Sequence, residues 1–296
     1  MKFFSPLPFL FVASCLWGQF DIQSNPSLAC RWHVGECAGH EHRLFSIESY
    51  RPMYLLFANR TNNINVRPFN GKNVVAQPLG YENTEVKFQF SFKSRILKTL
   101  IGQRSIFDMY VGFTQSSNYQ IYSENVSRPM REVNYEPELI MVVPVRYRIG
   151  KMRGSYVMLS VNHQSNGQQG ILSRSWDRLI LESGIENEHW SLIFRPWMRI
   201  RYVPTTDSNP DIQNYLGNGE IILAYRNGRH RVFAEKRHTF SNGLIGRGSI
   251  RAGYSYELAT GFKLHLQGFH GYGENLIDYN IFQTTYGIGV TFVEWK

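Results

Sequence analysis

The stretch VKFQFSFK, residues 86–93, alternates apolar and polar side chains at every position. Successive side chains of a β-strand point to opposite faces, so this pattern predicts a strand with one apolar and one polar face. The same alternation recurs in the stretches 139–145, 192–200, 262–267 and 282–292. About twelve such runs follow one another between Phe45 and Trp295, and bacterial membrane barrels favour an even number of strands.

The polar face of these runs separates a membrane barrel from a soluble sandwich, which would alternate as well. It carries long charged side chains that suit a polar lumen, among them Lys87, Lys93, Arg195, Arg199 and Arg201. Aromatic residues stand near the ends of the runs, where a membrane interface accommodates them: Tyr147, Trp190, Tyr202, Tyr225 and Trp295. We therefore predict an all-β chain in which residues 45–296 form a single transmembrane antiparallel β-barrel.

The composition agrees with strands rather than packed helices. Of the 296 residues, 43% are hydrophobic and 15% aromatic, yet the mean hydropathy is slightly polar. No internal stretch reaches the roughly 18 consecutive apolar residues that a membrane-spanning helix requires. The net charge of +9 is scattered over the strands without a dense basic block, so we do not expect a nucleic-acid partner.

The N-terminal residues are typical of an exported protein. Residues 1–18 combine Lys2 with an apolar run, as an export signal does. Residues 12–15 resemble the lipobox of bacterial lipoproteins, so Cys15 is either a lipidated first residue or part of a signal that is cleaved near Gly18. Residues 19–44 form an N-terminal extension whose conformation the pattern does not predict.

Two cysteines in this extension, Cys30 and Cys37, allow two interpretations. In an oxidising compartment a local disulfide is expected. The alternative is a metal site, because His33, His40 and His42 are interleaved with the cysteines.

Polar residues interrupt the apolar face in two consecutive runs, residues 156–165 and 174–182. His163 and Ser165 share parity with the apolar residues of the first run, and Asp177 shares parity with those of the second. All three are therefore expected to face lipid, where polar groups are costly unless they pair or have a function.

These three residue types match a general base, a nucleophile and an orienting acid. If the two runs form an antiparallel hairpin, Asp177 can meet one nitrogen of His163 while the other serves Ser165. The amide of Gly167 could complete an oxyanion hole. In the alternative interpretation, His163 and Asp177 are interfacial residues and Ser165 begins an ordinary turn. The chain has no G-x-S-x-G motif, so a soluble α/β-hydrolase is not predicted.

The segments HQSNG (163–167) and SRSWDRL (173–179) resemble the outer-membrane phospholipase A family of Gram-negative bacteria. Further segments resemble the family in the same order: 86–89, 131–137, 209–212 and 271–280. The resemblance runs from about Ser46 to the C-terminus. It implies a twelve-stranded barrel in the outer membrane that hydrolyses both acyl esters of phospholipids and lysophospholipids, requires calcium, and is active as a reversible homodimer.

The resemblance also assigns roles by position. Ser165 matches the nucleophile and His163 the general base, whereas Asp177 departs from the family, which has Asn there. For calcium, Ser173 matches a serine ligand, and Gln168, where Arg is usual, matches a backbone carbonyl ligand. Ser127 matches a serine supplied by the partner subunit, and Gln115 matches a glutamine of the dimer interface.

Two rival functions remain open from the sequence. A porin or structural barrel would place its working residues in the lumen, and His163 and Ser165 would then have no chemical role. An adhesin would use long external loops, whereas most connections here are expected to be short.

Overall fold

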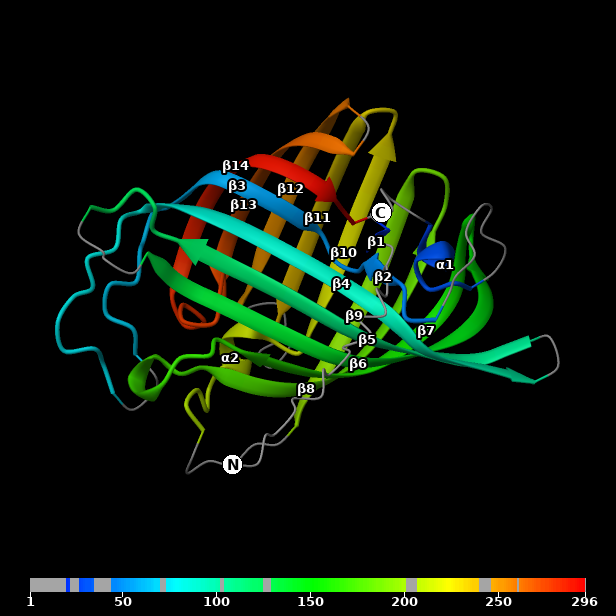
Figure 1. The fold of residues 1–296 in the computed structure, drawn as a ribbon, viewed down its shortest axis with the longest axis horizontal. Coiled ribbons are helices and arrows are strands. Elements are labelled where there is room, and N and C mark those ends of the chain that lie inside the picture. The colour runs from blue at the N-terminus through cyan, green and yellow to red at the C-terminus, as the bar shows by residue number, and fades with distance from the viewer. Residues whose placement is uncertain are drawn as a thin grey trace, which may run out of the picture.

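The computed structural model describes residues 20–21, 27–34, 44–69, 73–101, 104–124, 129–200, 207–239, 246–259 and 261–295. Within these ranges the chain forms a closed antiparallel barrel of twelve strands, β3 to β14, which confirms the predicted fold class (Figure 1). Closure comes from β14, which pairs with β3, and from β4, which pairs with both β3 and β5. A closed barrel satisfies every backbone group within the sheet, as hydrocarbon requires.

The strands are long, as the extended alternation predicts. They are β3 (Met53–Thr61), β4 (Thr84–Ile101), β5 (Arg104–Tyr119), β6 (Met130–Ile149), β7 (Met152–Ser165), β8 (Ser175–Glu186), β9 (Trp190–Ile200), β10 (Gly219–Asn227), β11 (His230–His238), β12 (Gly248–Ala259), β13 (Phe262–Tyr272) and β14 (Phe282–Val293). Outside the barrel ring, β1 (Phe20–Asp21) pairs with β2 (Ile47–Ser49), which pairs with β4. The helical elements are α1 (Leu28–Arg31), α2 (Gln213–Leu216) and the 3-10 turn η1 (Gly170–Leu172). None of the described helices is long and apolar enough to cross a membrane.

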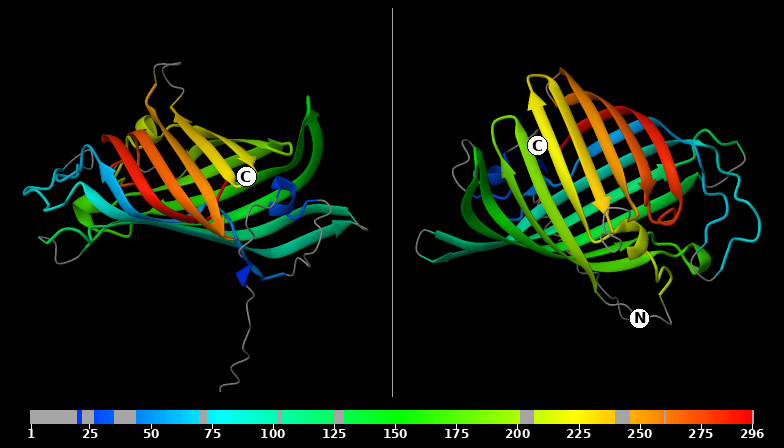
Figure 2. Two further views of the ribbon diagram at one scale, coloured as in Figure 1. Left: turned by 90° about the horizontal axis from the view of Figure 1, so that it is seen from above. Right: turned by 180° about the vertical axis from the view of Figure 1, so that it is seen from behind.

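The two ends of the barrel differ in their connections. Short turns join β6 to β7, β8 to β9 and β10 to β11, whereas longer segments follow β3, β9 and β13 at the other end. Figure 2 shows the β4–β5 hairpin and the β6–β7 hairpin at one end and the segment after β3 at the other. Outer-membrane barrels keep short turns on the periplasmic side and longer loops outside. The expectation of short connections therefore holds at one end.

The two faces of the sheet have the predicted polarity. Apolar side chains of the outer face remain exposed, among them Phe90 at 49%, Leu139 at 46% and Val161 at 49%. Lys87, Lys93 and Arg195 are buried in the lumen, while Arg201 and Tyr202 lie outside the described residues. One aromatic assignment was wrong: Trp295 is buried under Arg31, whose guanidinium lies 5.0 Å from the ring centroid, and so it is no interfacial residue.

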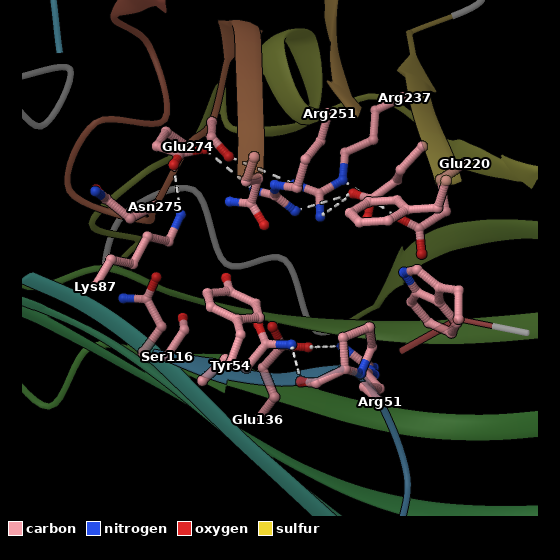
Figure 3. Close-up of a pocket in the computed structure, with 18 of the residues that line it drawn as sticks. Arg51, Tyr54, Lys87, Ser116, Glu136, Glu220, Arg237, Arg251, Glu274 and Asn275 are labelled. Atoms are coloured by element: carbon pink, nitrogen blue, oxygen red, sulfur yellow. Dashed lines mark hydrogen bonds and ion pairs between the residues drawn. The ribbon is translucent and has the colours of Figure 1, made fainter. Parts of the chain in front are cut away.

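Ion pairs fill much of the lumen (Figure 3). Glu274 accepts hydrogen bonds from Lys87 and Arg251, and Arg237 Nε lies 3.1 Å from Glu220 Oε2. The cavity between the described side chains at this place has a volume of about 80 Å³. Paired charges of this kind satisfy one another and leave little room for an aqueous channel.

Part of the N-terminal extension closes the short-turn end of the barrel. Trp32, which follows α1, is fully buried and packs against the rings of Tyr50 and Tyr110 at centroid distances of 5.7 and 5.5 Å. The α1 amides of Leu28 and Ala29 donate to Glu186 of β8. Cys30 of α1 is disulfide-bonded. Cys37, His40 and His42 lie outside the described residues, as do residues 1–18 with Cys15.

Truncation of Trp32 should release this segment. The Trp32→Ala substitution removes a buried aromatic and should cost about 3–5 kcal/mol of the free energy that holds residues 27–34 in place. Limited proteolysis and hydrogen exchange of the segment measure this loss. Leu44→Ala is the control, because Leu44 is 47% exposed; equal protection in both variants would contradict the role of Trp32.

Candidate active site

The hairpin of β7 and β8 places the three predicted residues on the lipid-facing wall. His163 lies directly opposite Asp177 in the strand register, and Ser165 lies opposite Ser175. Leu159 and Val161, which share the face of His163, are exposed outside the barrel. The prediction that these residues face lipid is therefore confirmed by the register. They lie at the rim of the barrel, at the end with the long loops.

His163 and Asp177 make direct contact. The Nδ1 atom of His163 lies 2.7 Å from Asp177 Oδ1, and the two side chains are 48% and 19% exposed. This contact fixes which ring nitrogen faces the carboxylate, so Nε2 remains on the open side of the ring. Ser165 is two residues further along the same strand and therefore on the same face.

Asn166 shapes the loop that joins the two strands. Its side chain is buried, and its amide group donates to Glu132 Oε2 at 3.2 Å and to the Leu172 carbonyl at 2.8 Å. Its carbonyl oxygen accepts from the amides of Gln168 and Arg174 at 3.3 and 2.9 Å. One side chain thus ties together both ends of residues 166–174.

Arg174 holds the same loop from the other side. Its guanidinium donates to the carbonyls of Ile171 and Ser173 at 2.7 Å and to the Phe69 carbonyl at 3.0 Å. The side chain is fully buried, and this burial lowers the pKa of Arg174 from its ordinary value. Neither Asn166 nor Arg174 was singled out from the sequence as a positioning residue, although both stand inside the quoted motif.

Gly167 occupies a position that disfavours a side chain. Its φ is +64°, and a Cβ atom there would lie 3.2 Å from the ring of Tyr135. Glycine adopts this left-handed conformation without strain and leaves its amide unobstructed. These are the properties that an oxyanion donor beside Ser165 needs.

A second buried asparagine, Asn209, holds the backbone at the start of β8. Asn209 Oδ1 accepts from the Ser175 amide at 2.9 Å, and Asp207 Oδ1 in turn accepts from the Asn209 amide at 2.9 Å. Asp207 also pairs with Arg199 of β9. Before the structure, Asn209 stood out only as part of the segment 209–212 that resembles the family, because it is far from Ser175 along the chain.

The predicted calcium ligands are neutral oxygen donors. Gln168 and Ser173 both belong to the loop that Asn166 and Arg174 fix, and Ser127 lies outside the described residues. Over the described ranges no three His, Cys, Asp or Glu side chains gather as a metal site. Hydroxyl and carbonyl oxygens are hard ligands, so the chemistry of this donor set fits calcium.

Gln115 lies in the same row of the wall as the predicted catalytic residues. It is opposite Tyr135 in the register of β5 and β6, and Tyr135 is opposite Ser165 in the register of β6 and β7. Gln115 also donates to Ser117 at 3.2 Å. The predicted interface residue and the predicted nucleophile are therefore two strands apart on one face.

An apolar recess adjoins the pair. It has a volume of about 620 Å³ and is lined by Val111, Leu139, Val161, His163, Asp177 and Ile200, among others. Its walls offer contact surface for hydrocarbon, and the His163–Asp177 pair lies in the same surface.

Asn166 offers a test of the loop. Asn166→Ala leaves buried donors and acceptors without partners and should lower activity by about 10- to 100-fold. Asn166→Asp is nearly isosteric but turns a carboxylate oxygen toward Glu132 and the Leu172 carbonyl, so it should be at least as harmful. Ester hydrolysis by folded protein is the measurement. Gln169→Ala is the control because Gln169 is exposed in the same loop; equal rates for all variants would contradict the role.

Comparison with known proteins identifies the family. The sequence profile of the family described as phospholipase A1 matches residues 30–292. The chain belongs to the phospholipase A1 family. A protein of Neisseria meningitidis named putative phospholipase A1 is 36% identical over 84% of this chain and 66% of its own length. The phospholipase A1 of Salmonella typhimurium is 33% identical over 83% of this chain and 81% of its own.

Solved structures of the family share the fold. The outer membrane phospholipase of Salmonella typhi, solved as a dimer with bound calcium, gives a TM-score of 0.76 at 31% identity and covers 86% of this chain and 95% of that one. This chain is thus a phospholipase A1 family barrel of the bacterial outer membrane, in a family of carboxylic ester hydrolases. The resemblance stated from the motifs is confirmed.

Proposed function

We propose that this protein is a calcium-dependent phospholipase A that hydrolyses the sn-1 and sn-2 acyl esters of phospholipids and lysophospholipids. The observation that carries the proposal is the 2.7 Å contact between His163 and Asp177 on the lipid-facing wall, on the same face as Ser165. A porin would have no use for this pair outside its lumen, and the lumen here is filled with ion pairs.

The residues support acyl transfer through a serine ester. His163 Nε2 takes the hydroxyl proton of Ser165 while the oxygen attacks the acyl carbonyl, and the Gly167 amide donates to the developing oxyanion. The protonated His163 then gives its proton to the departing glycerol oxygen. Water, deprotonated by His163, hydrolyses the acyl-serine and frees the fatty acid. Asp177 holds the ring and stabilises its charged form throughout.

Calcium would be held by the Ser173 hydroxyl and the Gln168 carbonyl, with Ser127 supplied by a second copy. When bound, the ion supplies positive charge for the oxyanion. Gln115 lies on the same wall, so a dimer formed through this face would bring two such sites together. Support comes from the Salmonella typhi relative, whose structure is a calcium-bound dimer.

Asp177 gives this site a charge that the asparagine of the family lacks. A carboxylate stabilises a histidinium more strongly than an amide does, especially when lipid or a partner excludes water. Asparagine would keep the hydrogen bond to His163 Nδ1 and lose only this charge, so the pair should tolerate return to the family residue.

The experiment is fatty-acid release by refolded protein in detergent from phospholipids labelled at either acyl position. We expect release from both positions with calcium and a loss of about tenfold or more with chelator. A sulfonyl fluoride should modify Ser165 and leave Ser175 unmodified, as mass spectrometry of the peptides would show. Release that is indifferent to chelator contradicts the calcium requirement, and the absence of both release and modification contradicts the enzyme.

A further inference from the structure

Unpaired basic side chains gather at the β6–β7 hairpin, at the opposite end of the barrel from the catalytic rim. They are Arg146, Arg148, Lys151 and Arg153, and all four are exposed. In the described part of the chain, neither a hydrogen bond nor an ion pair engages any of these side chains. Most lumen arginines, in contrast, are paired with carboxylates. Charges of one sign without partners repel one another, so an anionic ligand would stabilise the cluster.

The cluster borders a recess that could hold a headgroup. This recess has a volume of about 920 Å³, and the four basic residues line it together with Ser27 and Ser155. Two acidic residues, Glu186 and Glu188, line it too. Glu186 already accepts from the Leu28 amide at 3.0 Å and the Ala29 amide at 3.4 Å. Four positive charges against two negative ones leave the recess basic.

The neighbouring aromatic residue places the recess at the membrane surface. Tyr147 lies over Gly154, where an added Cβ would be 2.0 Å from its ring, and its hydroxyl lies 2.8 Å from Ser183 Oγ. Aromatic rings with a polar tip mark the headgroup level of a bilayer. The basic residues lie within six positions of Tyr147 along the chain, at the end with short turns, which faces the periplasm.

We propose that this recess binds the phosphate of an anionic phospholipid in the periplasmic leaflet. This lipid would stay bound and would not be hydrolysed, because the recess lies at the opposite end of the barrel from the proposed catalytic site at the long-loop rim. Basic pockets at the ends of membrane spans recognise anionic headgroups in this way. The lipid would also bridge the hairpin and the N-terminal segment, because Ser27 and Ala29 line the recess.

The test uses full-length protein with Ser165→Ala, so that lipid survives whether or not the chain is a lipase. Nanodiscs of phosphatidylglycerol with phosphatidylcholine supply the ligand, and native mass spectrometry counts the lipid retained after mild detergent extraction. We expect preferential retention of phosphatidylglycerol. Retention should fall about tenfold in the triple variant Arg148→Gln, Lys151→Gln, Arg153→Gln. The charge-keeping exchange Arg148→Lys, Lys151→Arg, Arg153→Lys should retain it.

A matched control removes three exposed charges at the opposite rim: Arg60→Gln, Arg67→Gln and Lys236→Gln. This variant should retain phosphatidylglycerol as the parent does. Equal retention of phosphatidylglycerol in both glutamine variants overturns the proposal, because the lipid would then bind through the protein's net charge or without a specific site at the hairpin. Displacement of the lipid by inorganic phosphate at low concentration would also overturn it, in favour of a site for soluble anions.

Discussion

Fatty-acid release should fall by about 10⁴-fold or more when Ser165 is replaced by alanine. The substitution removes the oxygen that attacks the ester, and neighbouring groups cannot replace it. His163→Ala should cost a similar factor, and the double variant should be little worse than either single one, because the two residues act as a unit. Residual release would report binding and oxyanion stabilisation alone.

Ser175→Ala is the matched control for this experiment. Ser175 lies directly across the strand pair from Ser165, and its contact with Asn209 uses the backbone amide, which alanine keeps. Its activity should stay within about threefold of the parent. All variants should migrate as folded barrels, since the substituted side chains lie outside the lumen. Equal losses for Ser165→Ala and Ser175→Ala would contradict the assignment of the nucleophile.

Asp177→Ala should lower release by about 10²- to 10⁴-fold, because His163 loses the contact that orients its ring. Asp177→Asn should stay within about tenfold of the parent, because the amide oxygen can still accept from Nδ1. The difference between the two variants separates orientation of the ring from stabilisation of its charge. Initial rates at saturating calcium are the measurement.

The control for Asp177 is Glu257→Gln, which removes one partly exposed negative charge at the short-turn end of the barrel, far from the rim. It should leave the rate unchanged. If Asp177→Asn loses as much as Asp177→Ala, the carboxylate charge is essential here, and this chain would differ in mechanism from relatives with asparagine. If neither variant loses activity, Asp177 has no orienting role.

The barrel and its outward-facing pair followed from the sequence because period-two alternation is a local property. Once Val161 is known to face lipid, His163 must face it too, and a hairpin brings Asp177 opposite. The supports of the loop are different. The contacts of Arg174 with Phe69 and of Ser175 with Asn209 join segments far apart in the chain, and no period reveals them.

The N-terminal segment and Trp295 show the same limit. Trp32 is buried because Tyr110 of β5 and Tyr156 of β7, both far away in sequence, surround it together with Tyr50, which follows β2. Trp295 stands near a strand end, as an interfacial residue would, but Arg31 covers it from inside the barrel. Side-chain parity predicts which face of the sheet a residue occupies. It does not predict which residues of the N-terminal segment will contact that residue.

Because His163 and Ser165 face outward, the substrate concentration that matters for the reaction is a concentration within the membrane surface. A lipid substrate would reach them by moving sideways within a leaflet, so the relevant concentration would be the mole fraction of substrate in the membrane around the barrel. Inert detergent added at constant bulk substrate would slow the reaction by surface dilution. The encounter is two-dimensional, and the supply of lipid to that leaflet would govern turnover as directly as the chemistry does.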